Sequence, residues 1–495
     1  MGLPDLYPAQ VGSPYTTLAA PYATGETTMT VVDATKLPDA PNIVCLAGSV
    51  AGEFRYSGKN GNTLLGVVKL PGTPNATWPV GTYAFRGIAA YDHNSLMTHV
   101  TQGSTPDLLN RVVYESDEVG NTLEIHQVYI PLFYGAGLPD ANLNGVLFGG
   151  FWMDKYLACQ PDASNVSRGS VSPNAPGANG AASKPHVVPW TVIGWYNAKR
   201  AIENRGGAAN RKSGTCTPLA EASASKFYVE DISHLIGKRV YVTQGGVRYV
   251  RRVVRTGGDT TADPNAAKLL ELYPPLPAPI TDADTYEILH YYLPGGYEWM
   301  SLYAWAYMNL YRHGLGWPKG NTDYGKYHGD PRERVYEGLP DPVQPGYRGN
   351  AISRTLTGSG PLSWSLNGKE SGIWDLVGNC WEWCDLLVGT TADNTIDAEY
   401  PGAGHVLPTS NGYVASLYAP EPDGEHSVGA EVFVPATLGS SNANYDGAYY
   451  WQEPGQCAAF RGGAFDVDAR CSLAYLNLNR TPSYAGTTFG FRGVC

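Results

Sequence analysis

Charged residues are scarce in this sequence. Asp, Glu, Lys and Arg make up 16% of its 495 residues, whereas hydrophobic residues make up 43%. A chain with this balance buries a core readily, so global disorder is not expected. The length predicts two or three domains rather than one.

Basic residues are the scarcer kind of charge. The chain has 34 Lys and Arg against 45 Asp and Glu, a net charge of −11. Nonspecific nucleic-acid binding needs stripes of basic side chains that displace counterions. The only dense basic run is Arg248–Arg255, and its alternation predicts a strand with a solvated face. We therefore expect no nucleic-acid partner.

Long apolar runs and export signals are also missing. No stretch of about 18 apolar residues occurs, so we expect no membrane insertion. Met1–Asp5 lacks the basic region and apolar core of a signal peptide, and Tyr7 replaces the Ser or Thr of a myristoylation signal. We expect synthesis in the cytoplasm, with release by lysis or as part of a particle.

The eight cysteines form no Cys-x-x-Cys pair. Cys380 and Cys384 are four positions apart, and the rest are scattered. A disulfide framework or a zinc site would need paired, closely spaced cysteines. The sequence predicts mostly buried free thiols.

Common catalytic motifs are absent as well. We find no Gly-x-Ser-x-Gly elbow, phosphate-binding Walker loop or His-Glu-x-x-His pair. On a strand, Asp466 and Asp468 would lie on the same face. Their carboxyls would then be close together, as the two carboxyls of a glycosidase must be. A loop with solvated acids is the alternative. We expect the protein not to be an enzyme.

Glycine, proline and tyrosine are abundant, at 59, 37 and 34 residues. This composition is typical of a loop-rich fold with many turns. Short apolar or alternating runs separated by turn residues indicate an all-β module over residues 1–95. These runs are Thr28–Val32, Asn42–Leu46, Glu53–Tyr56 and Leu64–Val68.

A second segment of the chain, residues 217–290, has a sequence pattern similar to that of this module. Val31-Val32-Asp33 matches Val229-Glu230-Asp231, and both segments have a Leu four residues later. Further matches follow in the same order: Ile43-Val44 with Val240–Val242, Phe54–Tyr56 with Tyr249–Arg251, Leu64-Leu65 with Leu269-Leu270, and Thr82-Tyr83 with Thr285-Tyr286. We interpret these as two copies of one β module. Chance similarity of short β runs is the alternative.

The second copy interrupts another domain. Phe151–Tyr156 predicts a strand, followed by a Gly/Ser/Pro/Asn-rich loop over 161–185. Apolar residues recurring every three to four positions predict a helix over Pro189–Ile202, and Leu293–Met300 opens a second helix that runs to about residue 310.

Five motifs follow one another in this domain: Asp154-Lys155-Tyr156, the Trp-containing helix, Leu293–Trp299, Gly372–Trp383, and a tail from Arg461-Gly462-Gly463 to Gly490-Phe491-Arg492. Together they resemble the C-type lectin fold of the formylglycine-generating-enzyme type. The resemblance implies an α+β fold. Its first part would cover 96–216 and the rest 291–495, with an N-terminal β module and a related inserted β domain outside it.

The resemblance bears on catalysis. Formylglycine-generating enzymes use two cysteines five positions apart, just after the Arg-Gly-Gly. Those positions fall on Val467 and Ser472 here, and Cys471 alone cannot make the pair. An oxidase of this type is therefore the least favoured alternative.

The resemblance also implies a metal site but requires no cofactor. The family binds calcium through the carboxylates that correspond to Asp375 and Glu382 and through backbone oxygens at Gly378 and Cys380. Hard oxygen ligands around a Gly-containing turn suit Ca²⁺. In the alternative, the two carboxylates satisfy buried backbone N–H groups.

One branch of the family is diversified by retroelements that rewrite adenines in Asn codons. Such codons cannot become Lys, Glu, Gln, Met or Trp, and none of these five occurs from Arg461 to Cys495. The Leu476–Asn479 segment predicts a strand with Leu inward and Asn outward. The predicted ligand-binding residues are Ala464, Phe465, Asp466, Val467, Asp468, Arg470, Cys471, Ser472, Tyr475, Asn477, Asn479, Arg480 and Tyr484. An ordinary, undiversified lectin tail is the alternative.

These features predict a binding protein with a rigid frame around a variable surface. The resemblance implies recognition of a protein or glycan receptor on a target cell by a phage or prophage tail component. The N-terminal module would attach to the virion, and a homotrimer would add avidity. The aromatic stretch Asn444–Trp451 either flanks the site or belongs to the core. A calcium-dependent lectin-like binder is the main alternative.

Overall fold

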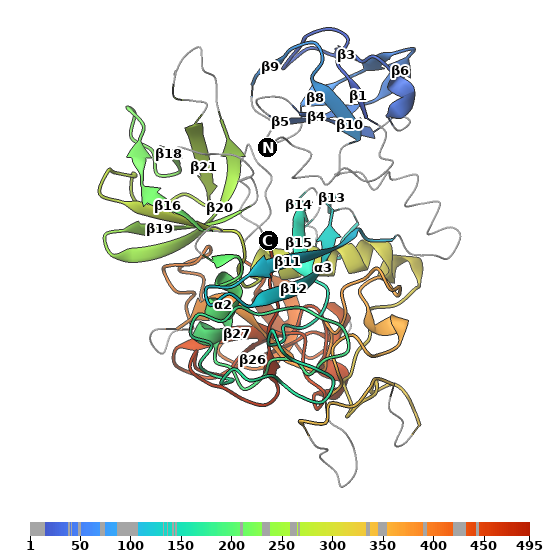
Figure 1. Ribbon diagram of the computed structural model, residues 1–495, viewed down its shortest axis with the longest axis vertical. Helices are drawn as coiled ribbons and strands as arrows, with labels where there is room; N and C mark the ends of the chain where they lie inside the picture. The colour runs from blue at the N-terminus through green and yellow to red at the C-terminus, as the bar shows by residue number, and fades with distance from the viewer. Residues whose placement is uncertain are drawn as a thin grey trace.

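The structure is a computed structural model. It describes residues 15–37, 40, 42–47, 51–69, 75–86, 107–131, 133–135, 137–140, 143, 146–207, 211–229, 238–257, 265, 268–332, 337–344, 354–389, 394–418, 432–441 and 445–495. The described chain is mostly β, with two α-helices, α2 (Trp195–Glu203) and α3 (Gly296–Asn309) (Figure 1). Neither has the length and apolarity needed to cross a membrane.

The N-terminal module packs its strands around a core of its own. Its main sheet has the order β1 (Tyr15–Thr17), β10 (Tyr83–Arg86), β4 (Asn42–Ala47), β5 (Ala51–Tyr56) and β8 (Val68–Lys69). Smaller sheets pair β2 (Tyr22–Ala23) with β9 (Thr77–Trp78), and β3 (Thr28–Thr30) and β6 (Gly58–Asn60) with β7 (Thr63–Leu65). Tyr22, Phe54 and Trp78 meet in the core, with ring centroids 5.0 to 6.2 Å apart.

The inserted module repeats this strand order. Its sheet runs β16 (Arg211–Thr215), β22 (Thr285–Leu289), β19 (Arg239–Gln244), β20 (Val247–Thr256), β21 (Leu269–Tyr273), β18 (Lys226–Tyr228) and β17 (Thr217–Pro218). The first five strands correspond in order to β1, β10, β4, β5 and β8, and every pairing is antiparallel in both modules.

Several matched sequence segments occupy equivalent strands, but Leu64-Leu65 lie on β7, whereas Leu269-Leu270 lie on β21, the counterpart of β8. Ile43-Val44 and Val240–Val242 lie on β4 and β19, and Phe54–Tyr56 and Tyr249–Arg251 lie on β5 and β20. The inserted sheet begins at Arg211, before the predicted bound of 217. The shared topology gives the two modules a common architecture in spite of their different lengths.

The third domain surrounds a seven-stranded mixed sheet. Its order is β25 (Pro435–Gly439), β24 (Gly412–Leu417), β26 (Tyr449–Gln452), β28 (Leu476–Leu478), β27 (Cys457–Arg461), β23 (Trp381–Val388) and β29 (Phe489–Gly490). A second sheet contains β11 (Asn110–Ser116), β12 (Thr122–Ile130) and β15 (Phe151–Asp154), and β13 (Phe133–Tyr134) pairs with β14 (Leu147–Phe148). Short 3₁₀ turns are η2 (Ala34–Lys36), η6 (Tyr311–His313), η7 (Leu362–Trp364), η8 (Tyr445–Gly447) and η9 (Asp468–Arg470).

Both predicted helices are present. The first begins at Trp195 rather than at Pro189, because residues 190–194 form a mostly buried, non-helical segment in which Val192 has a φ of 62° and the Trp190 amide donates to the Ala158 carbonyl. The second begins after Gly295, whose amide donates to the Glu298 carboxylate at 2.7 Å. This bond satisfies one of the amide groups that a helix start leaves open.

A buried ionic network connects the distant motifs of this domain. Arg492 donates to both carboxylate oxygens of Glu382, at 2.5 and 2.7 Å, and to the carbonyl oxygens of Asp154 and Trp374. The Asp154 side chain accepts two bonds from Arg205, at 2.8 and 2.7 Å. These four charged side chains are fully buried. Buried charges persist only when paired, so the motifs form one structural unit.

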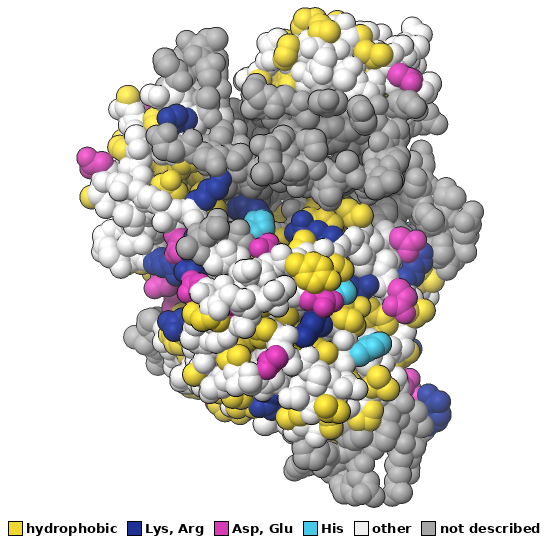
Figure 2. All heavy atoms as spheres, viewed as in Figure 1, with side chains coloured by type: hydrophobic (Ala, Val, Ile, Leu, Met, Phe, Trp, Pro, Cys, Tyr) yellow, Lys and Arg dark blue, Asp and Glu magenta, His cyan; other side chains and the backbone are white. Residues whose placement is uncertain are grey.

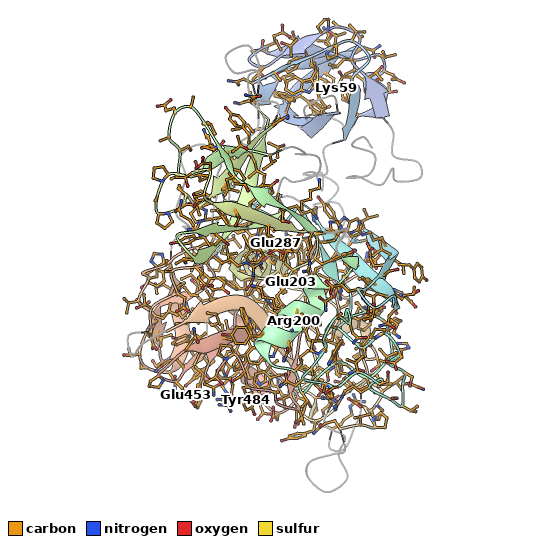
Figure 3. All side chains as sticks on the ribbon, turned by 60° about the vertical axis from the view of Figure 1, so that its left-hand side comes forward. Lys59, Arg200, Glu203, Glu287, Glu453 and Tyr484 are labelled. Carbon is orange, nitrogen blue, oxygen red and sulfur yellow. The ribbon has the colours of Figure 1, made fainter. Side chains whose placement is uncertain are left out.

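A second buried network docks the inserted module on this domain. Arg239 of β19 bonds Asp385 of β23 at 2.5 Å, and Arg252 of β20 bonds Glu298 of α3 at 2.6 Å. Lys199 of α2 bonds the other oxygen of Asp385 at 2.8 Å. Figure 3 shows Glu203 of α2 just below Glu287 of the inserted module. The strand predicted for the basic run is confirmed, but its solvated face is wrong because Arg251 and Arg252 are buried at this junction.

Candidate ligand-binding surface

Both ends of the tail, residues 461–495, are held in the core. Gly462 and Gly463 adopt φ values of 82° and 92°, a region that favours glycine. A Cβ on Gly462 would lie 2.6 Å from the Leu376 carbonyl oxygen, and one on Gly463 would lie 2.2 Å from the Cys471 sulfur. At the other end, Arg492 sits in the network with Glu382. Neither end can shift without disturbing the core.

Between these ends, the structure buries seven of the thirteen predicted binding residues: Ala464, Phe465, Val467, Cys471, Ser472, Tyr475 and Asn477. The expectation that these side chains face water is wrong. Phe465 packs edge-on against Tyr324 at 5.6 Å, and Tyr475 packs against Trp381 at 4.8 Å. Such contacts give these residues a packing role.

The other six predicted residues reach the surface. Asp466, Asp468 and Tyr484 are exposed, and Arg470, Asn479 and Arg480 are half-buried. Asp466 and Asp468 belong to a turn that ends in η9. They are therefore solvated acids in a loop, which was the alternative to a pair of carboxyls on one strand. These six residues remain candidates for contact with a ligand.

Three aromatic residues of neighbouring strands extend this surface. Tyr413 of β24 pairs directly with Tyr449 of β26, and their rings meet edge to face at 5.1 Å. Trp451 lies two positions further along β26, on the same face, and its partner in β28 is Asn477. All three aromatic side chains are half-buried. Tyr449 and Trp451 therefore flank the predicted site, although Tyr450 between them is core.

Arginine side chains lie over the aromatic rings. The Arg470 guanidinium is 5.6 Å from the Tyr449 ring centroid, and that of Arg480 is 4.8 Å from the Tyr484 ring. Figure 3 shows Tyr484 beside Glu453 at the lower edge of the sheet. A partner would meet alternating aromatic and cationic groups here. We call Tyr413, Tyr449, Trp451, Arg470, Arg480 and Tyr484 the aromatic surface.

Buried rings support the aromatic surface from below. The Tyr475 ring centroid lies 6.2 Å from that of Tyr449 and 4.8 Å from that of Trp381. The ring centroids of Trp381 and Phe460 are 5.0 Å apart. Burial raises the pKa of the Tyr475 phenol above its usual value. Tyr475 is therefore neutral at physiological pH. Its buried ring supports the aromatic surface from below. Edge-to-face pairs of this kind fix ring orientations.

Tyr413 was missed by the sequence analysis. It is a single tyrosine in a segment that resembles no motif, and only its pairing with Tyr449 gives it a place beside the tail. The alternation of Tyr449 and Trp451 around Tyr450 was the available signal for the other two.

The predicted calcium ligands do not fit a calcium site. Arg492 engages both oxygens of Glu382, and one oxygen of Asp375 accepts from the Gly358 amide at 2.7 Å. Burial raises the pKa of Asp375 to about 6, which weakens it further as a ligand. Among the residues described, no group of three or more His, Cys, Asp or Glu side chains could hold a metal ion. The alternative, in which these carboxylates satisfy buried backbone N–H groups, holds for one oxygen of Asp375 but not for Glu382, whose partner is the Arg492 side chain.

The cysteine expectation holds where thiols are described. Seven cysteines, including Cys380, Cys384, Cys471 and Cys495, are free and buried. Burial raises the pKa of the Cys471 thiol above its usual value, which disfavours a reactive thiolate.

Comparison with known proteins returns structural neighbours only. No protein-family model matches the chain, and no curated protein does. Treponema denticola variable protein 1 aligns over 79% of this chain and 99% of its own, at 13% identity and a TM-score of 0.28. The P3c variant of Major Tropism Determinant aligns over 96% and 82%, at 12% identity and a TM-score of 0.25. Its U1 variant aligns over the same shares, at 12% identity and a TM-score of 0.18.

By name, these neighbours are a variable protein and two variants of a tropism determinant. At these TM-scores the likeness carries no argument about this chain. The aromatic surface has to be judged from its own geometry.

Proposed function

We propose that this chain is a diversified ligand-binding protein that recognises a receptor through the aromatic surface. The supporting observation is that half-buried aromatic and arginine side chains lie on and beside a tail whose two ends are fixed in the core. In this proposal the domain around the surface is a C-type lectin fold of the formylglycine-generating-enzyme type.

Residue chemistry supports binding at this surface. Tyrosine, tryptophan and arginine supply much contact area at a low cost in side-chain entropy, and they dominate binding hot spots. Asp466, Asp468 and Asn479 provide hydrogen-bonding groups around them. The rigid support beneath the rings lowers the entropy that a ligand must remove on binding.

The wider proposal concerns a phage or prophage tail. The receptor would be a protein or glycan on a target cell, and the N-terminal module would attach the chain to the virion. Association into a trimer would present several surfaces at once and raise the avidity. In this proposal the protein is not an enzyme. The alternative of a calcium-dependent lectin is less supported because its ligand set does not fit.

Cell binding tests the receptor role. The fluorescently labelled full chain should bind some strains in a panel of bacterial cells, measured by flow cytometry. Tyr449→Ser should lower this binding at least tenfold, because it removes a ring that both Tyr413 and Arg470 contact. Tyr114→Ser is the matched control, since Tyr114 is 67% exposed on a different sheet. Equal loss in both variants would contradict the proposal.

Population sequencing tests the diversification. The neighbouring DNA should encode a reverse transcriptase and hold an Asn-rich near-copy of the tail. In a propagated population, substitutions should concentrate at exposed tail positions such as Asp466, Arg470 and Tyr484. Gly463 and Arg492 should not vary, because the core depends on them. Variation spread evenly along the chain would exclude diversification of the tail.

A further inference from the structure

Strand β11 is an edge strand whose outer side pairs with no other described strand. It lies at one end of the sheet β11-β12-β15, and all seven of its residues pair with β12. The Tyr129 amide donates to the Leu109 carbonyl at one end of this pairing, and the Asp117 amide donates to the Asn121 carbonyl at the other. Hydrogen-bonded positions alternate in an antiparallel pair, so residues 111, 113 and 115 also bond to β12.

The remaining residues of β11 direct their backbone groups to the outer side. These residues are Asn110, Val112, Tyr114 and Ser116. Within the described chain, no backbone hydrogen bond reaches their amides or carbonyls from that side. Their side chains are exposed as well, Tyr114 to 67% and Val112 to 44%. A row of unpaired backbone groups with apolar side chains is a template for a further strand.

Other edge strands carry residues that oppose such pairing. β8, β16, β17 and β25 lie at the ends of their sheets, and each contains a lysine or a proline. Lysine and proline are common protections of an edge strand. β11 contains neither of them. Its outer side is therefore open to backbone pairing.

The sequence of β11 is complementary to itself in an antiparallel pair. When two copies are aligned around Val113, each residue faces the one that lies equally far on the other side of this centre. Arg111 then faces Glu115 of the second copy, and Val112 faces its Tyr114, and each of these pairs occurs twice. Opposite charges, and β-branched residues beside aromatic ones, are favourable cross-strand pairs. In this alignment, all the outward backbone groups of β11 exchange hydrogen bonds with the second copy.

The two charged residues of this alignment have no ion pair of their own. Arg111 donates to the Gln127 side chain at 2.9 Å and to the Cys495 sulfur at 3.0 Å. Glu115 accepts from the Tyr291 hydroxyl at 3.0 Å. No ion pair within the described chain includes either charge. Both side chains are half-buried, so an opposite charge from a second copy would act in a partly desolvated setting.

We propose that two copies of this chain pair through β11, antiparallel and centred on Val113. The two sheets would then form one continuous sheet across the contact. A second copy is the occupant that the strand itself fits, because one alignment matches its charged, apolar and polar positions together. The contact joins chains in twos, so it is distinct from the proposed trimer and does not depend on the proposed function.

Disulfide formation in the full chain tests the pairing. The two copies of position 113 would form a non-hydrogen-bonded pair with Cα atoms about 4.5 Å apart, which is within the range of a disulfide. Val113→Cys should therefore give covalent dimers under mild oxidation, measured by mass spectrometry of the intact protein. Ser116→Cys is the control, because this more exposed position would lie roughly 20 Å from its own copy. We expect at least tenfold more dimer from Val113→Cys.

A proline tests the part played by the backbone. Proline at position 114 removes only an outward amide, so the pairing of β11 with β12 stays intact. In the Val113→Cys chain, Tyr114→Pro should lower the yield of dimer at least tenfold. Tyr114→Ser keeps the amide and should lower the yield far less. If Tyr114→Pro fails to fold, Val112→Pro removes the neighbouring outward amide in the same way.

Three results would overturn the proposal. Equal yields of dimer from Val113→Cys and Ser116→Cys would mean that the chains meet by random collision. An unchanged yield in a Tyr114→Pro chain that circular dichroism shows to be folded would mean that the edge is not used. A new thiol at position 113 that stays reduced, or that links only to another protein, would mean that a second copy is not the occupant.

Discussion

At the scale of single residues, Asp446 combines a left-handed backbone conformation with a half-buried carboxyl group. Its raised pKa has a consequence for stability. The folded chain holds a proton on this carboxyl up to about pH 8, whereas the unfolded chain releases it near its ordinary value of 3.8. The folded state therefore binds more protons in between, so the free energy of unfolding falls as the pH rises through this window.

We predict that Asp446→Asn removes this contribution. Relative to the parent, the variant should gain up to about 1 kcal/mol of unfolding free energy per pH unit between pH 5 and pH 7.5. Urea unfolding at several pH values, followed by tryptophan fluorescence, measures the difference. The phenols of Tyr303 and Tyr327, whose pKa values the Asp446 charge raises, are present in both proteins and stay neutral in this pH range. Parallel stability curves for parent and variant would refute the prediction, and Asp282→Asn should give such a curve.

Residue patterns explain why the tail was only partly predictable. The alternation of Leu476, Asn477 and Leu478 correctly placed both leucines in the core. It could not place Asn477, because Phe460 and Trp451 of the adjacent strands cover its face. Alternation identifies opposite faces of a strand, whereas exposure depends on neighbours that are distant in sequence.

At the scale of elements, the turn that joins β27 to the tail depends on close packing. Gly463→Ala would adopt an unfavourable φ and meet the Cys471 sulfur. We predict a loss of about 2–4 kcal/mol of unfolding free energy, since conformational strain and overpacking add together. Thermal unfolding monitored by circular dichroism measures it.

Two matched variants separate these causes. Gly455→Ala has a similar φ of 109° but no atom within 4 Å of the added Cβ, so it should lose only about 1–2 kcal/mol. Adding Cys471→Ala to Gly463→Ala should restore the unfolding free energy that is lost through overpacking. The loss that comes from the unfavourable φ should remain. If the double variant is no more stable than Gly463→Ala alone, the clash with the sulfur is not the cause.

Element positions were well indicated by the sequence where the local signal was strong. The prediction that Leu293–Met300 opens the second helix is confirmed, since α3 begins at Gly296. The helix predicted from Pro189 begins later, at Trp195, because residues 190–194 pack as a non-helical segment against other parts of the chain. Tertiary contacts decided this boundary, and periodicity cannot show them.

At the scale of the whole molecule, the two β modules differ in how they join the rest. The N-terminal module has a core cluster drawn only from residues 18–84. The inserted module places Arg239 and Arg252 against Asp385 and Glu298, all four of them buried. Figure 2 shows acidic and basic side chains interspersed across the middle of the face in view.

We predict opposite outcomes for removing the two modules. A chain that starts at residue 107 should unfold at nearly the same temperature as the matching domains of the full protein. A chain in which a short loop replaces residues 212–288 should lose cooperative unfolding, because an unpaired buried charge costs about 3–5 kcal/mol. Scanning calorimetry distinguishes them. A cooperative transition in the second chain would show that the ion pairs contribute little.

The repeat was visible in the sequence because some equivalent strands, such as β4 with β19 and β5 with β20, have similar side chains at matching places. The ionic docking was not, since Arg239 and Asp385 are separated by 146 residues and carry no local signature. The basic run was interpreted as solvated for the same reason. Pairing between domains follows from the three-dimensional arrangement alone.

In both modules the first strand of the main sheet pairs with the last, β1 with β10 and β16 with β22. The chain therefore enters and leaves each module at neighbouring points. Such a unit can be copied at the level of the gene and placed within a surface loop of another domain without separating that loop's ends.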